Sequence, residues 1–213
     1  MAKRNILIEN ERTVTKENLL FEQVKQLLDD ARTRIARTVN TTIVNVYWQI
    51  GKYIVEYEQG GQGRAAFGKD IINKLSERLT KEYGKGFSPA NIRYMRQFYQ
   101  CFPFCHALSD KLTWTHWRTL LKVQDETVRN FYLTECISGN WSVRQLERQI
   151  NTLFYERMLA SKDQKTVREE IQRSVPQALE PKEIIRDPYL LEFLGLSQSE
   201  HFLKSDLEQM IIT

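Results

Sequence analysis

A long run of apolar residues at helical spacing lies near the start of the chain. The spacings are three, four and seven residues, which is the pattern of one face of an α-helix. The positions are Leu20, Val24, Leu27, Leu28, Ile35, Val39, Ile43, Val46, Ile50 and Ile54. With Thr15 as N-cap, the pattern predicts a helix over residues 15–58, either unbroken, bent near Asp29–Thr33, or arranged as a coiled coil. Because β-branched residues crowd between Thr38 and Val46, packing must offset a low helix propensity there.

Glycines end this helix. Gly60, Gly61 and Gly63 predict a flexible loop. No Gly-Lys-Ser/Thr follows them and no strand precedes them, which argues against a phosphate-binding loop. A second helix is predicted over Phe67–Tyr83.

The next segment has the layout of a helix-turn-helix. Gly84-Lys85-Gly86 ends the second helix, and Ser88 is placed to cap a third. Pro89 then occupies the first helical position, where its missing N–H costs nothing. The third helix is predicted to end near Gln100, before Pro103, and a short turn between two helices is typical of this motif.

Further capping signals predict a second pair of helices. Trp114 or Thr115 begins a helix, and Asp125 caps the next one. Gly139-Asn140 ends that helix. Ser142 with Gln145 forms a capping box for a helix from Val143 to about Ala160.

The predicted fold class is mainly α. No strand-rich block is present, and no internal repeat at a fixed period of the kind that builds solenoid folds. We expect a helical N-terminal domain with helix-turn-helix-like units, which a wing could accompany, and a short C-terminal stub.

Composition favours a cytoplasmic protein without a membrane segment. Hydrophobic residues make up 41% and charged residues 27%, as in globular proteins. No apolar run approaches the roughly 20 residues that span a bilayer, and the polar N-terminus does not resemble a signal peptide. Three cysteines, Cys101, Cys105 and Cys136, do not form a disulfide framework.

Basic residues gather in one part of the chain. The formal net charge is +4, and the segment from Arg64 to Arg96 holds eight basic and three acidic side chains. A local basic excess permits a polyanionic partner without requiring one.

The third predicted helix carries side chains suited to nucleic acid. Arginine binds phosphates and guanine edges, whereas asparagine and glutamine bind adenine, and a helix N-terminus binds phosphate. The candidate nucleic-acid-binding residues are Lys85, Ser88, Asn91, Arg93, Arg96 and Gln97. The alternative is an ordinary solvated helix face.

Other polar and aromatic groups have simpler interpretations. Arg144 and Arg148 alternate with glutamates, which favours a salt-bridged surface. The helical spacing of Trp114, Trp117 and Trp141 favours an aromatic core over a base-stacking platform.

No metal, cofactor or catalytic site is predicted in this chain. Cys101, Cys105 and His106 lie near His116, but no paired Cys-x-x-Cys accompanies them. Asp163 with Glu180-Pro181-Lys182 imitates a metal-nuclease spacing, but the proline and the lack of a surrounding strand argue for coincidence.

Five stretches of the chain carry a resemblance to a known family. In order, they are Val46–Lys52, Phe87–Tyr99, Leu112–Trp117, Asn140–Ile150, and Asp187-Pro188-Tyr189 with Glu192–Leu196. Together, over roughly residues 20–213, they resemble the bacterial YhcG family. The resemblance implies an α-helical, helix-turn-helix-like DNA-binding module followed by a PDDEXK nuclease domain.

The resemblance also implies a division of the chain. Residues 15–160 are expected to form the DNA-binding domain, 161–183 a linker, and 184–213 the incomplete start of the nuclease domain. The capping box Ser205–Glu208 resembles the first nuclease helix, and the metal-binding residues would lie beyond Thr213, so Mg²⁺ is expected only for a complete nuclease domain.

These observations leave three functional hypotheses. The first is DNA binding and positioning for a nuclease, with DNA as partner and with RNA not distinguished from it. The second is a protein-interaction or homo-oligomerisation module through the long N-terminal helix. The third, an active hydrolase within these 213 residues, lacks a complete site.

Overall fold

The computed structural model describes residues 2–60, 65–104, 110–161 and 187–193. Regular structure in these ranges is helical, with no strand among the described residues, which confirms the mainly α prediction. The elements are α1 (Ala2–Gly60), α2 (Ala65–Tyr83), the 3₁₀-helix η1 (Lys85–Phe87), α3 (Pro89–Cys101), α4 (Trp114–Leu120), α5 (Glu126–Gly139), α6 (Val143–Asn151), α7 (Phe154–Ala160) and α10 (Pro188–Phe193). Among the described helices, none is both long and apolar enough to cross a membrane.

Helix α1 is a single continuous helix of 59 residues. It begins at Ala2, so the prediction that Thr15 caps it is wrong, and it does not break at 29–33. No glycine or proline occurs between its start and Gly51, so no residue in that stretch obliges the helix to end.

The β-branched part of α1 is stabilised in two ways. The Thr38 and Thr42 hydroxyls donate to the carbonyls four residues earlier, at 2.9 and 2.8 Å. Ile43 and Val44 are buried in the core. Packing therefore offsets the low propensity of this segment, as the sequence required.

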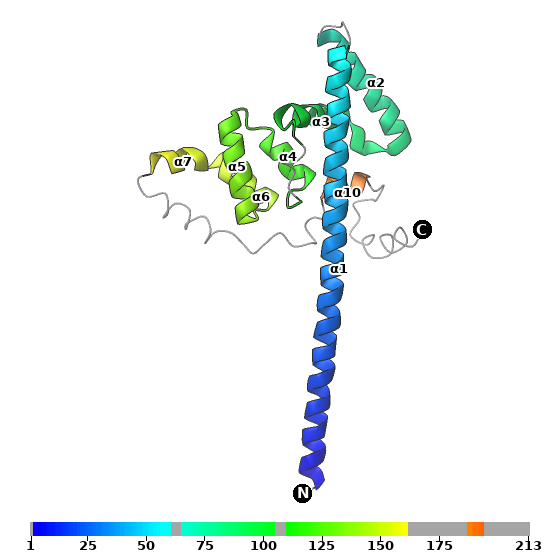
Figure 1. The fold of residues 1–213 in the computed structure, drawn as a ribbon, viewed down its shortest axis with the longest axis vertical. Helices are drawn as coiled ribbons and strands as arrows, with labels where there is room; N and C mark the ends of the chain where they lie inside the picture. The colour runs from blue at the N-terminus through cyan, green and yellow to red at the C-terminus, as the bar shows by residue number, and fades with distance from the viewer. Residues whose placement is uncertain (1, 61–64, 105–109, 162–186, 194–213) are drawn as a thin grey trace.

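The C-terminal half of α1 supports the helical body (Figure 1). It packs most extensively against α3 and also contacts α4 and α10. At its centre Gly51 is buried against the Met95 backbone. The Trp48 indole N–H donates to the Phe102 carbonyl at 2.7 Å, which fixes the end of α3.

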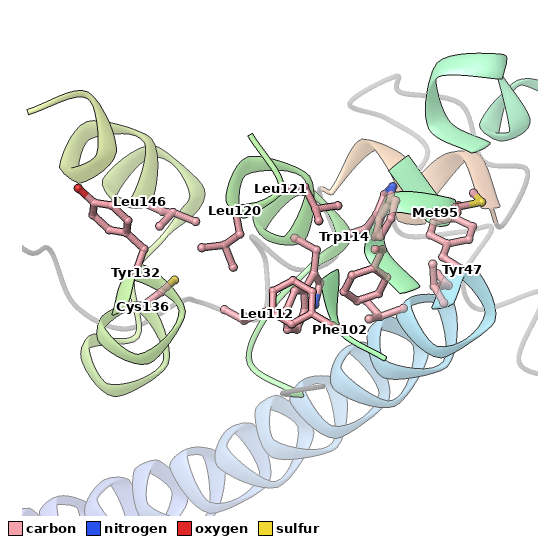
Figure 2. Packing of buried hydrophobic residues seen from close by; sticks show 14 of the residues in the cluster. Tyr47, Met95, Phe102, Leu112, Trp114, Leu120, Leu121, Tyr132, Cys136 and Leu146 are labelled. Carbon is pink, nitrogen blue, oxygen red and sulfur yellow. The ribbon is translucent and has the colours of Figure 1, made fainter. Parts of the chain in front are cut away.

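An aromatic core lies between α1, α3 and α4 (Figure 2). Trp114 and Trp117 are buried, and their rings lie 5.3 and 4.9 Å from that of Phe98. Tyr47 reaches from α1 to Trp114, with ring centroids 5.0 Å apart. These tryptophans are core residues, which confirms the interpretation against a stacking platform.

The capping signals of the second pair of helices are confirmed. Asp125 accepts from the Val128 N–H at 2.9 Å at the start of α5. Asn140 ends α5 in the left-handed conformation, with φ 47°. Ser142 and Gln145 form the capping box of α6, and the Gln145 Oε1 accepts from the Ser142 N–H at 2.6 Å.

The predicted helix from Val143 to Ala160 is wrong in its middle. It divides into α6 and α7 at Leu153, which has φ 50°. The Tyr132 hydroxyl donates to the Gln149 carbonyl and accepts from the Tyr155 N–H, both at 3.2 Å. A side chain from α5 thus supplies bonds at the break, which no glycine or proline signals.

Helix α10 packs on the body rather than apart from it. It contacts α1, η1 and α4. Asp187 is buried just before it, and its carboxylate accepts from the Tyr189 N–H at 3.0 Å and from the Thr115 N–H at 3.4 Å. Of the segment 184–213, residues 187–193 are thereby fixed to the N-terminal helices. The second capping box, Ser205–Glu208, lies outside the described residues, as does nearly all of the predicted linker.

Candidate nucleic-acid interface

The glycine and serine signals predicted from the sequence act at the junction of α2, η1 and α3. Gly84 ends α2 with φ 91°. The Ser88 Oγ accepts from the Asn91 N–H at 3.3 Å, and Pro89 occupies the first turn of α3. The Ser76 hydroxyl donates to the Phe87 carbonyl at 2.7 Å, which holds η1 against α2.

Asn91 is a core residue and is not available to a base. It is 2% exposed. Its Nδ2 donates to the Gly86 carbonyl at 2.7 Å, and its Oδ1 accepts from the Trp114 indole N–H at 2.8 Å. In this structure both ends of the Asn91 amide are used to join η1 to α4, which favours a structural role over the predicted contact with nucleic acid.

Arg96 and Gln97 are partly buried and engaged within the molecule. The Arg96 Nη1 lies 2.9 Å from the Glu58 Oε1 of α1. The Gln97 amide donates to the Leu121 carbonyl at 3.0 Å. Glu58 compensates the charge of Arg96, and Gln97 ties α3 to the end of α4.

Arg93 is the exposed cation of α3 that the sequence indicated. Its side chain has no ion pair or hydrogen bond among the described residues. Gln100, seven residues later, is exposed on the same side of α3. Ser88 is exposed at the N-terminus of this helix, and the side chain of Lys85 lies outside the described part of the structure. The outer face of α3, defined here as Ser88, Arg93 and Gln100, is thus the accessible part of the predicted site.

A stacked arginine at the other side of α3 was not predicted. Arg118 of α4 lies over the rings of Tyr94 and Tyr189, 4.5 and 4.6 Å from their centroids. The stack joins α3, α4 and α10. No pattern in the sequence pairs these residues, since Tyr189 is far from Arg118 along the chain.

His116 has a structural role in place of a metal-binding one. The Thr113 N–H donates to its Nδ1 at 3.1 Å, so the ring proton is on Nε2, which donates to the Trp141 carbonyl at 3.0 Å. Across the described residues, no group of three His, Cys, Asp or Glu side chains could hold a metal. Cys105 and His106 lie outside these residues.

Stability is expected to depend on pH through His116. Burial lowers its pKa below the ordinary value of 6.5. The unfolded chain therefore binds a proton here more readily than the folded chain, so the free energy of unfolding should fall as the pH drops below 6.5. The measurement is urea unfolding at pH values above and below this point.

The control for this prediction is His116→Gln. Glutamine is a usual residue at this position of a capping box and does not titrate. The variant should lose part of the pH dependence seen in the parent chain. Equal pH dependence in both proteins would contradict the assignment.

A comparison with protein-family models gives the kinship of the chain. The model described as the DUF1016 N-terminal domain matches residues 23–157. The chain belongs to this family. The DUF1016 match runs from α1 to α7 and includes the whole of α3.

A curated relative extends this finding. The chain is 36% identical over 237 residues to "Putative nuclease YhcG" of Escherichia coli (strain K12). The similarity covers 95% of this DUF1016 chain and 62% of the relative, so the chain spans less than two thirds of that protein. The resemblance to the YhcG family is thereby confirmed. No solved structure matches the chain.

Proposed function

We propose that this chain binds DNA through the outer face of α3 and positions it for a nuclease. The observation that carries the proposal is Arg93, an exposed cation without an ion pair among the described residues, on a helix whose Ser88 end is accessible. Helix N-termini bind phosphate and exposed arginines add charge, so together they suit a nucleic-acid backbone.

The charge of the neighbouring segment supports this proposal. Between Arg64 and Arg96 the chain has five more basic than acidic residues. Such an excess attracts a polyanion over several ångströms. In the proposed arrangement α2, η1 and α3 act as a helix-turn-helix whose second helix approaches the duplex, with Lys85 beside its N-terminus.

The buried residues of the site act indirectly in this proposal. Asn91 and Gln97 fix the orientation of α3 through backbone carbonyls of η1 and of Leu121. Arg96 contributes less than Arg93 because Glu58 already pairs with it. Arg93 and the N-terminus of α3 would contact the DNA backbone, so the affinity should be similar for many DNA sequences.

The nuclease part of the proposal rests on kinship. The relative is named "Putative nuclease YhcG", and this chain spans 62% of its length. The packing of α10 on the body supports a positioning role, because the chain leaves α10 from a point anchored to α1 and α4. DNA held on α3 would then stand at a defined place relative to whatever follows residue 193.

Arg93→Ala is expected to weaken DNA binding about fivefold to tenfold, the cost of one phosphate or base contact. Fluorescence anisotropy with a labelled duplex measures this. Arg144→Ala is the matched control, since Arg144 is also exposed on the first turns of a serine-capped helix. Equal affinities of the two variants would show that α3 is not the binding face.

A further inference from the structure

The N-terminal half of α1 presents an apolar face that the molecule leaves uncovered. Every side chain from Lys16 to Arg32 is exposed, and the first buried one is Ala36. In Figure 1 this half extends away from the other labelled helices. The large apolar side chains on it include Leu20, Val24 and Leu28, which are 62%, 46% and 51% exposed.

Val24 and Leu28 belong to an eleven-residue repeat of positions along α1. Its members follow one another at spacings of four, three and four residues. They are Val24, Leu28 and Ala31, then Ile35, Val39 and Thr42, then Val46, Ile50 and Tyr53, and finally Tyr57. Eleven residues make three turns at about 3.67 residues each, so the repeat keeps to one side of a nearly straight helix. We call these ten residues the α1 stripe.

The N-terminal part of the α1 stripe lies away from the body, whereas Val39, Val46 and Ile50 pack against its core. Residues that pack on α3 and α4, such as Tyr47, Gly51 and Ile54, lie on another side of the helix at 100° per residue. The stripe is about 50 Å long. At its C-terminal end Tyr53 and Tyr57 are 65% and 60% exposed, while Val46 and Ile50 are half-buried.

A helix of this kind needs a partner. In water an isolated helix is marginal, and most helical stability comes from packing of an apolar face. Residues 16–32 bury no side chain within the described molecule. Contiguous apolar surface of this extent is rare on monomers and marks an interaction site.

We infer that the α1 stripe pairs with the same stripe of a second copy of this chain, with the two helices parallel and in register. This inference does not rest on DNA binding. A parallel pair places each apolar layer against its identical counterpart, Leu28 on Leu28 and Ile35 on Ile35. Apolar repeats of seven or eleven residues are typical of helices that pack along one another.

The charges beside the stripe select the parallel arrangement. Lys25 and Arg32 lie along one edge, and Leu20 and Leu27 along the other. A parallel pair brings opposite edges together, so each basic side chain lays its stem over a partner leucine. An antiparallel pair over residues 20–35 brings like edges together and opposes Lys25 to Arg32 of the other copy, which is repulsive.

Leu28→Asp tests the inference by placing a carboxylate on the stripe. We expect the parent chain to be a dimer at micromolar concentration in analytical ultracentrifugation, and the dissociation constant of the variant to rise roughly a hundredfold or more, because two unpaired charges would face each other. Leu19→Asp is the matched control. Leu19 is 61% exposed. It lies nine residues before Leu28, which is about two and a half turns, so it is on the opposite side of the helix.

A second measurement tests the orientation and guards against misfolding. Ile35→Cys should form a disulfide-linked dimer under mild oxidation, whereas Leu19→Cys and the parent chain should not. An antiparallel pair centred near residue 28 would hold the two Ile35 positions about 20 Å apart, so it would not form this disulfide. A parent chain that stays monomeric overturns the inference, as do equal effects of the two aspartates. A monomer whose residue 20–35 amides resist hydrogen exchange would also overturn it and assign the stripe to another segment of the same chain. DNA anisotropy of Leu28→Asp separates this result from the proposed function, since the α3 face is unchanged.

Discussion

Gly51→Ala is expected to destabilise the protein by about 2–3 kcal/mol, because α1 and α3 cross in contact at this glycine. An added Cβ would lie 2.8 Å from the Met95 carbonyl carbon and closer still to its oxygen, and 3.2 Å from the Tyr99 Cβ. These are backbone and near-backbone atoms, so no flexible side chain can move aside. Alanine favours a helix by about 1 kcal/mol over glycine, which offsets only part of the clash.

The measurement is the thermal midpoint, which should fall by roughly 5–10 °C for a chain of this size. Gly60→Ala is the matched control on the same helix, since its added Cβ meets no atom within 4 Å. That variant should be neutral or slightly more stable. If Gly51→Ala melts with the parent chain, the helices do not cross as closely as described.

Asn91→Ala is expected to cost about 2–4 kcal/mol, because it leaves two buried groups without partners. The Gly86 carbonyl loses its 2.7 Å donor, and the Trp114 indole N–H loses its 2.8 Å acceptor. Both are deep enough that water does not replace the amide readily. The loss appears as a lower midpoint in urea with an unchanged m-value.

The same variant separates a structural role from a DNA contact. Once corrected for the folded fraction, Asn91→Ala should bind DNA as the parent chain does. The control is Asn130→Ala, an exposed helical asparagine whose removal should change stability little. Unchanged stability together with lost DNA affinity would restore Asn91 as a contact residue.

Local signals predicted where most helices begin and end. Ser88 with Pro89, Asp125, and Ser142 with Gln145 each act within four residues, so their bonds can be foreseen from the chain alone. The long run of apolar residues at helical spacing likewise predicted α1. Its start at Ala2 was missed because Thr15 imitates a cap inside a helix that nothing interrupts.

Which residues of the candidate site are buried and bonded within the molecule could not be predicted in the same way. Asn91 meets Trp114 across 23 residues, and Arg96 meets Glu58 across 38. A polar residue on a helix has the same sequence pattern whether it faces solvent or a buried carbonyl. The break at Leu153 has the same cause, because the Tyr132 hydroxyl that bonds there comes from another helix.

The salt dependence of DNA binding tests the central claim most directly. The parent chain would be titrated onto labelled linear duplex, branched and single-stranded DNA by anisotropy at several salt concentrations. We predict that log affinity falls linearly with log salt, with a slope of roughly two to four for contacts through Arg93 and its basic neighbours. A chain that binds none of these DNAs at low salt would contradict the account.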